Sequence, residues 1–132
     1  MDQPESPASA PVRTVLLRHD EPGGGWHFDW MLERPGEPWR GLLTFRTRER
    51  PDGGGATLHA TRLGDHRRAY LEYEGEVSGG RGRVTRVAAG VVEALEERPD
   101  GVRVVVRFGG ARAGWMGAPG RTRAERWVFR RF

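Results

Sequence analysis

The octapeptide WHFDWMLE, from Trp26 to Glu33, alternates large apolar side chains with polar ones, which is the pattern of a β-strand. In an extended chain, successive side chains point to opposite faces. One face carries Trp26, Phe28, Trp30 and Leu32, and the other carries His27, Asp29, Met31 and Glu33. We expect the first row to be the buried side of the strand. The second row is polar except for one methionine, so it is the face on which chemistry is to be sought.

Seven further runs of similar length lie on either side of this strand, separated by turns rich in Gly, Pro and Asp. They are Thr14–His19, Gly41–Thr47, Ala56–Arg62, Gly82–Val87, Gly90–Glu97, Gly101–Phe108 and Arg126–Phe132. Eight strands are enough to close a small barrel. The sequence therefore predicts an all-β fold, a small closed or nearly closed β barrel of about eight strands.

The segment GDHRRAYLEYEG, residues 64–75, departs from the strand pattern. Asp65 can cap a short helical turn, in which His66 and Tyr70 are four residues apart and share one face. If the segment is extended instead, His66, Arg68 and Tyr70 line one side. We favour the helical turn, and both alternatives bring His66 and Tyr70 to the same side.

Length and composition predict one small domain. The chain has 132 residues, of which 36% are hydrophobic, and this suffices for a modest core. It contains no cysteine, which excludes disulfides, thiolate metal sites and cysteine nucleophiles. Residues 1–12 hold two acids and three prolines without an apolar run, so we expect a disordered lead and a barrel domain over residues 13–132. We expect a cytoplasmic monomer that does not enter a membrane.

The charge of the chain points to a polyanionic partner without proving one. The formal net charge is +4, and all 22 basic residues are arginine. Arginine binds phosphate through a planar fork of donors, so an arginine-rich surface suits nucleic acid. A GC-rich genome would also favour arginine codons, and that explanation stands beside the functional one.

Five polar residues in these segments are candidates for a metal and phosphate site. They are His19, His27, Asp29, His66 and Tyr70. Two histidines and a carboxylate suit manganese or zinc and leave coordination positions open for a phosphate oxygen. A further histidine and a tyrosine can donate hydrogen bonds to that phosphate. Taken singly, each residue also has an ordinary explanation as a solvated histidine or a packed tyrosine.

A family resemblance joins these residues. The order RHD, HFDWMLE, DHRRAYLEYEGEVSGGRGRV, GVRVVVRF and RWVFRRF resembles the 3′-phosphoesterase domain of bacterial DNA ligase D over most of residues 14–132. Members of that family are small β barrels that use manganese or a similar ion to remove a terminal 3′ ribonucleoside, and then the 3′ phosphate, from a primer. The resemblance implies that His19, His27 and Asp29 hold the metal and that His66 and Tyr70 contact the phosphate as catalytic residues.

The same resemblance implies a biological setting, which is the processing of 3′ ends of DNA or RNA during repair. The substrate would be the 3′ end of a primer strand. A DNA ligase or a polymerase would be a partner in trans, because this chain resembles the phosphoesterase domain alone.

One departure from the family bears directly on activity. Met31 stands where the family motif H-Y-D-F-R-L-E has an arginine, so a phosphate-binding guanidinium is replaced by a thioether. Arg62 and Arg68 are the candidates to bind the phosphate in its place. We therefore consider three hypotheses. The first is a metal-dependent 3′-phosphoesterase, the second is a weakened or inactive module that binds 3′-phosphate ends, and the third is a purely structural or interaction domain.

Overall fold

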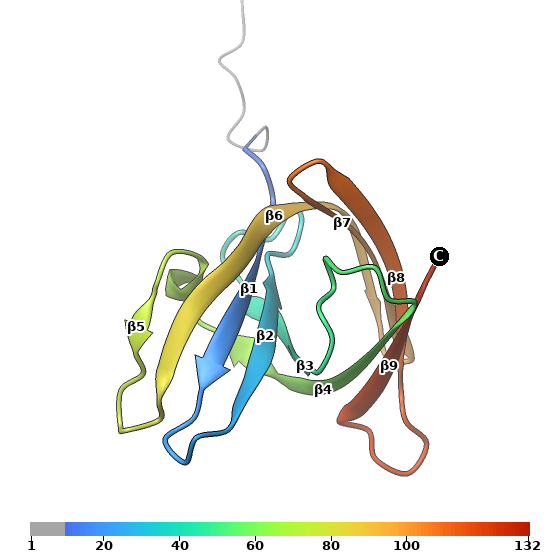
Figure 1. Ribbon diagram of the computed structural model, residues 1–132. Coiled ribbons are helices and arrows are strands. Elements are labelled where there is room, and N and C mark those ends of the chain that lie inside the picture. The colour runs from blue at the N-terminus through green and yellow to red at the C-terminus, as the bar shows by residue number, and fades with distance from the viewer. Residues whose placement is uncertain (1–9) are drawn as a thin grey trace, which may run out of the picture.

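Residues 10–132 are described by a computed structural model, which contains nine β-strands and one short 3-10 helix, η2, in that range (Figure 1). The strands are β1 (Arg13–Asp20), β2 (Trp26–Leu32), β3 (Leu42–Thr47), β4 (Thr57–His66), β5 (Gly75–Glu76), β6 (Arg83–Arg98), β7 (Gly101–Phe108), β8 (Ala111–Pro119) and β9 (Arg126–Arg131). The helix η2 spans Arg68–Leu71. Within the described range, no helix is long and apolar enough to span a membrane.

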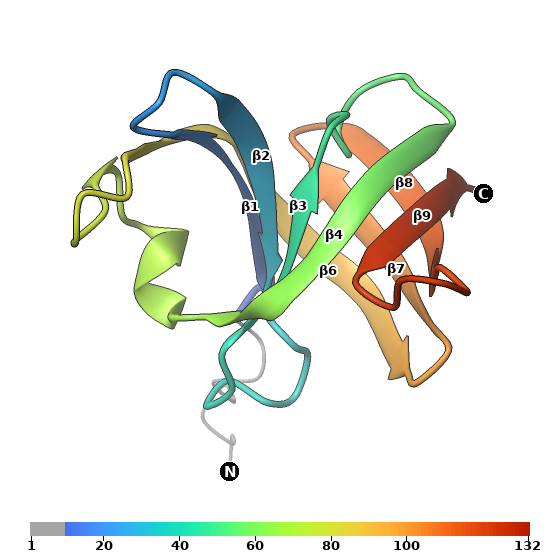
Figure 2. The same ribbon diagram turned by 90° about the horizontal axis from the view of Figure 1, so that it is seen from below.

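Eight of these strands form a ring. Their order is β1-β2-β3-β4-β9-β8-β7-β6, every neighbouring pair is antiparallel, and β6 pairs back with β1. The predicted all-β barrel of about eight strands is therefore confirmed. The short strand β5 lies outside the ring on the edge of β6, and Figure 2 shows η2 and β5 on the side where β1 and β2 lie.

The two strands predicted over Gly82–Val87 and Gly90–Glu97 are one continuous strand, β6. Its first half pairs with β1 and its second half with β7. Gly90 is a point of close approach and not a break, because a Cβ atom there would lie 2.1 Å from the carbonyl oxygen of Arg107. The glycine that suggested a turn is needed where two backbones meet.

The strand β8 was not predicted. Its residues, ARAGWMGAP, are mostly small and show little alternation. The reason is that aromatic rings cover its glycines, since a Cβ on Gly114 would lie 2.6 Å from Cζ of Phe132 and one on Gly117 would lie 2.3 Å from Cε2 of Phe129. Side chains from outside β8 fill the space that its own would otherwise occupy.

The barrel interior is an aromatic and aliphatic core. The row of β2 that was expected to be buried largely lies there, with Phe28 at 8%, Trp30 at 0% and Leu32 at 1% exposure. Trp26 is the exception, because it begins the strand at the rim of the barrel and remains 48% exposed. Its ring packs edge-on against Phe28 and under the guanidinium of Arg18.

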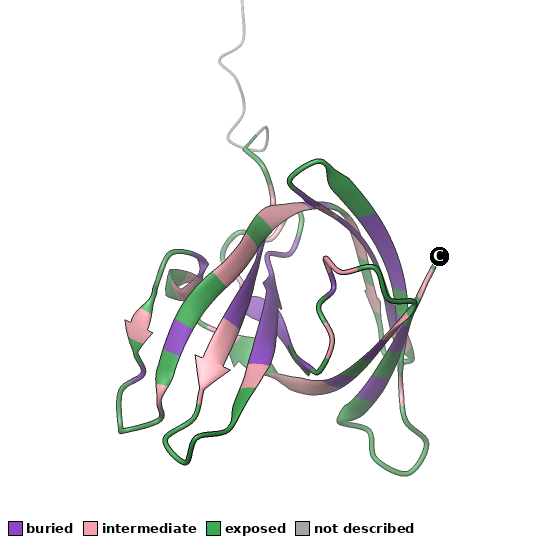
Figure 3. Ribbon diagram, viewed as in Figure 1, coloured by how far each residue is buried: buried purple, intermediate pink, exposed green. Residues whose placement is uncertain are grey.

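A second apolar cluster lies on the outer face of β1, β2 and β3. It consists of Val15, Leu17, Met31, Leu42, Leu71, Val77 and Val84. Leu71 ends η2 and Val77 follows β5, so the chain between β4 and β6 covers this face. Both faces of β2 are consequently buried, and Figure 3 shows nearly continuous burial along β2, in contrast to the alternation along β9.

The predicted N-terminal lead, residues 1–12, falls mostly outside the described residues, which begin at residue 10. Val12 belongs to the described part. It packs against the barrel core, and its carbonyl oxygen accepts a hydrogen bond from the N–H of Val92 at 2.7 Å. The barrel therefore begins by residue 12.

A buried arginine joins four parts of the barrel. Arg34, which follows β2 and is 4% exposed, donates to the carboxylates of Asp65 at 2.9 and 3.1 Å and of Glu97 at 2.6 and 3.1 Å. It also donates to the carbonyl oxygen of Gly41 at 2.7 Å. The hydrogen bonds from Arg34 lower the pKa of Glu97. This Arg34 clamp ties the end of β2 to the start of β3, the end of β4 and the far half of β6.

We expect Arg34→Met to lower the free energy of unfolding by about 1.5–3 kcal/mol, because Asp65 loses its partner and Glu97 keeps only its contact with Arg62. Urea denaturation measures the loss. The matched control is Arg40→Met, which removes a part-exposed pair with Glu37 and should cost less than about 1 kcal/mol. Equal losses for the two variants would contradict a structural role for the Arg34 clamp.

Candidate metal centre

Two neighbouring strands bring together the three predicted metal ligands. His19, near the end of β1, is the register partner of His27 on β2, and their ring centroids are 4.8 Å apart. Asp29 lies two residues after His27 and therefore on the same face of the strand. One ligand atom from each residue lies within 4.8 Å of the others, a spacing that a single cation can span.

The carboxylate of Asp29 is buried and poorly satisfied. It is 3% exposed, and its Oδ1 atom lies 3.1 Å from Nε2 of His27. Both of these atoms are buried and have no hydrogen-bond partner among the described residues. A buried carboxylate without hydrogen bonds is costly, so an orphaned nitrogen and oxygen that face each other fit the ligand atoms of a cation site.

The tautomer of His19 supports the same reading. Its Nε2 atom lies 2.7 Å from the carbonyl oxygen of Arg81, and because a carbonyl only accepts, this nitrogen carries the hydrogen. In neutral His19, Nδ1 then has a bare lone pair, which lies 3.5 Å from Oδ2 of Asp29. Both atoms are of the kind that can ligate a cation. A backbone carbonyl that orients a ligating histidine is common in metal sites.

A cleft of about 240 Å³ opens beside these ligands and brings the other two predicted residues to the same place. It is lined by His19, Asp29, Met31, Asp65, His66, Arg67, Tyr70, Val77, Arg81 and Val84. The ring centroids of His66 and Tyr70 are 5.8 Å apart on its far wall. His66 donates from Nδ1 to the carbonyl oxygen of Gly64 at 2.9 Å, which leaves Nε2 for a ligand.

The local structure around His66 differs from the predicted capped turn. Asp65 and His66 are the last residues of β4, and η2 begins at Arg68 without a side-chain cap at Arg67. Asp65 does not cap the helix because it lies in β4, two residues before the N-cap position, and Arg34 holds its carboxylate. A helical turn does follow, and the segment does place His66 beside Tyr70.

The structure does not place Arg62 or Arg68 in the cleft. Arg62 pairs with Glu97 at 3.3 Å and lies 5.6 Å from the ring centroid of Trp127, on the barrel side of the sheet. Arg68 is bound to Glu33, which is 8% exposed. Both arginines therefore already have carboxylate partners that hold them away from a phosphate.

Two other arginines line the cleft, and the sequence reasoning missed them. Arg67 is exposed and forms no ion pair with any described residue. Arg81 donates from Nε to the carbonyl oxygen of Ser78 at 2.7 Å. The signal for Arg67 was its position directly after His66, whereas Arg81 lies in a glycine-rich turn whose path cannot be read from the sequence.

Met31 forms part of the floor of the cleft and is 1% exposed. It packs in the outer apolar cluster, so the thioether is a core side chain that also borders the site. No charged group occupies the place where the resemblance implies an arginine. The other walls must supply any guanidinium that reaches a ligand.

Comparison with models of protein families and with curated proteins finds no match to this chain. The geometry of the cleft and the resemblance of its motifs therefore carry the functional inference.

We expect Asp29→Asn to keep or raise the melting temperature of the EDTA-treated protein, because it removes a buried and unsatisfied charge. With Mn²⁺ at about 100 times its dissociation constant, wild type should gain about 2.7 kcal/mol, or roughly 10 °C in Tm. The variant should gain nothing. Calorimetry with and without Mn²⁺ measures both effects.

The control for this experiment is Asp20→Asn, which removes a half-exposed carboxylate at the end of β1. It should respond to Mn²⁺ as wild type does. A Mn²⁺-dependent gain that persists in Asp29→Asn would remove Asp29 from the metal ligands.

Proposed function

We propose that this protein is a cytoplasmic, metal-dependent phosphoesterase that acts on 3′ ends of DNA or RNA in end processing and repair. The single observation that carries the proposal is the convergence of His19, His27 and Asp29 on one side of a cleft whose other side presents His66 and Tyr70. The resemblance to the ligase D phosphoesterase domain supports the same assignment.

The donor set suits a divalent ion of the manganese or zinc type. Two imidazoles and one carboxylate form an open set of three protein ligands, which leaves room for a phosphate oxygen. Bound there, the ion would supply a Lewis acid that polarises the phosphate. The side chains of Asp29 and His27 are only 5% and 10% exposed, so electrostatic interactions between them and a bound ion are weakly screened.

His66 and Tyr70 then act on the phosphate from the opposite wall. The hydrogen bond from Nδ1 to Gly64 fixes the ring of His66, so that in the imidazolium form Nε2 can donate to the phosphate or protonate the departing 3′ oxygen. In the overall reaction, water adds to phosphorus, the bond from phosphorus to the 3′ oxygen breaks, and that oxygen gains a proton. The Tyr70 hydroxyl is the second donor.

The second hypothesis, a module that binds 3′-phosphate ends with little or no turnover, rests on Met31. Methionine supplies no charge to the transition state, and Met31 is packed in the outer apolar cluster at 1% exposure, so its side chain fills that place. A DNA ligase or polymerase would then use the bound end in trans. The two hypotheses share a ligand and differ only in chemistry.

Release of inorganic phosphate from a 3′-phosphorylated primer in the presence of Mn²⁺ tests the proposal. We expect Asp29→Asn to abolish release and His66→Ala to reduce it by about 10²- to 10⁴-fold. His66→Ala should retain the Mn²⁺ affinity of wild type in calorimetry. Release that is unchanged in both variants would show that the cleft is not the active site.

Met31→Arg decides between the enzyme and the binding module. The new guanidinium would point from the cleft floor toward the phosphate and should increase the rate roughly 10- to 100-fold over a slow wild type. Met31→Leu conserves the packing and should leave the rate unchanged. Phosphate release by all three proteins is measured under the same conditions.

Two results would contradict that expectation. If wild type already reaches ordinary enzymatic rates and Met31→Arg slows it, another arginine acts on the phosphate, and Arg67→Ala and Arg81→Ala would identify it. If neither protein turns over but both bind 3′-phosphorylated ends with salt-sensitive affinity, the binding module is the function.

A further inference from the structure

Two rows of side chains cross the outer face of the barrel and lead away from the metal centre. Register pairing across β2, β3, β4 and β9 aligns the first row, which is Asp29, Arg46, Thr61 and Arg126. The second row is Arg48, His59 and Val128, and His27, which precedes the last register pair Phe28–Thr47, lies at its β2 end; the N–H of Arg48 donates to the carbonyl oxygen of His59, and His59 pairs with Val128. Each row therefore begins at a candidate metal ligand and ends on β9.

A groove of about 690 Å³ lies between the two rows. Its floor is the intervening register row of Thr47, Ala60 and Trp127, whose side chains are buried. His27 contributes to the metal centre and also lines this groove, so the two sites share a wall. The groove runs across the strands, because its walls follow the register and not any single strand.

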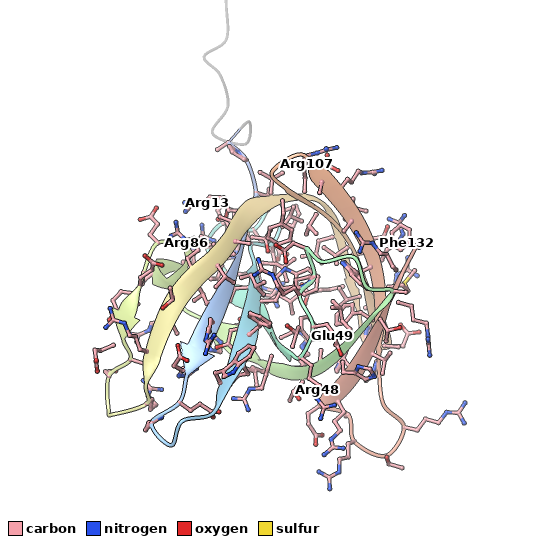
Figure 4. All side chains as sticks on the ribbon, viewed as in Figure 1. Arg13, Arg48, Glu49, Arg86, Arg107 and Phe132 are labelled. Carbon is pink, nitrogen blue, oxygen red and sulfur yellow. The ribbon has the colours of Figure 1, made fainter. Side chains whose placement is uncertain are left out.

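The groove is basic. Arg46, Arg48 and Arg126 line it, all three are exposed, and none forms an ion pair with a described residue. The neighbouring acid, Glu49, is engaged with His59 at 3.0 Å. Burial raises the pKa of Glu49, but the hydrogen bonds from His59 outweigh this and lower it. Figure 4 shows Arg48 and Glu49 close together near the lower rim of the barrel.

Trp26 adds an aromatic surface at the end of the groove nearest the metal centre. It is 48% exposed, and the guanidinium of Arg18 lies 4.3 Å from its ring centroid. A large apolar ring held rigid at the surface and flanked by arginines is the combination that proteins use to stack a base beside a bound phosphate.

We propose that this groove binds a single strand of nucleic acid, with phosphates on Arg46, Arg48 and Arg126 and a base against Trp26. A strand that enters over β9 would deliver its terminus to His27 and Asp29. The direction of the strand, with its 3′ end at the metal centre, rests on the proposed function, whereas binding in the groove does not. A paired duplex fits less well because its bases are already stacked on one another.

The length of the groove sets the size of the ligand. From β2 to β9 there are three strand-to-strand steps, or about 14 Å at ~4.8 Å per step. At a stacked spacing of ~3.4 Å, this corresponds to about four nucleotides. Affinity should therefore rise with oligonucleotide length up to about four nucleotides and change little beyond that.

Fluorescence anisotropy with 3′-phosphorylated oligothymidylates of one to eight nucleotides, in EDTA, tests strand binding without turnover. The double variant Arg46→Gln, Arg126→Gln should lower the slope of log affinity against log salt by about 1.4, since each single-strand phosphate contact contributes ~0.7. Trp26→Ala should weaken binding roughly tenfold. Arg112→Gln, on an exposed arginine away from the groove, should have little effect.

Three results would overturn the proposal. In the first, affinity does not depend on oligonucleotide length. In the second, Arg112→Gln lowers the salt slope as much as the groove variants do. In the third, blunt duplex binds more tightly than single strand and depends in the same way on Arg46 and Arg126. Circular dichroism should show that the variants remain folded, since the replaced arginines are exposed.

Measurements of phosphate release distinguish strand binding in the groove from phosphoesterase activity at the cleft. If both hold, the Arg46→Gln, Arg126→Gln double variant releases phosphate from thymidine 3′-phosphate as wild type does but acts more slowly on the tetranucleotide. If the phosphoesterase assignment fails, no protein releases phosphate, yet length-dependent binding remains. If only the groove fails, release occurs at rates that do not depend on length or on Arg46 and Arg126.

Discussion

The burial of β2 on both faces is the constraint on which the site depends. Its inner row fills the barrel core, and its outer row carries Asp29 at 3% and Met31 at 1% exposure. A carboxylate in that position is tolerated only if something compensates its charge. The nearest groups are imidazole nitrogens of His19 and His27, so the strand that organises the fold also presents a candidate cation site.

The outer face of β2 is covered by residues that lie far from it in the sequence. Leu71 and Val77 pack on Met31 from the segment between β4 and β6, and the same segment carries Tyr70. The Arg34 clamp holds Asp65, the neighbour of His66, against the end of β2. The contacts that close this end of the barrel thus also set the distance between the two walls of the cleft.

His27 has a central place because it belongs to the candidate metal centre and to the basic groove. The arginines divide accordingly. Arg34, Arg62 and Arg68 are tied to carboxylates and support the fold, whereas Arg46, Arg48 and Arg126 have no described acidic partner and face solvent. The first three arginines therefore form structural ion pairs, and the other three form a surface that suits phosphates.

Much of this architecture could be predicted from the sequence, because alternation is a local property of a strand. The all-β barrel, the inward direction of Phe28 and Trp30, and the grouping of His19, His27 and Asp29 all follow from period two and from pairing between consecutive strands. The number of strands was right only because dividing β6 in two offset the omission of β8. The missing strand, β8, has glycines in place of an alternating pattern, because rings that contact it from Phe129 and Phe132 supply its apolar surface.

Only the tertiary structure decided which surfaces are covered and which arginines are free. Alternation shows that Met31 shares a face with Asp29, but whether that face is open depends on Leu71 and Val77, far along the chain. Likewise, the sequence cannot show that Arg62 and Arg68 already have carboxylate partners, since those partners are 35 residues away in each case. Local sequence sets the face of the strand on which a side chain lies. Its burial and its charge partners depend on segments that are distant in the sequence and pack against it in the fold.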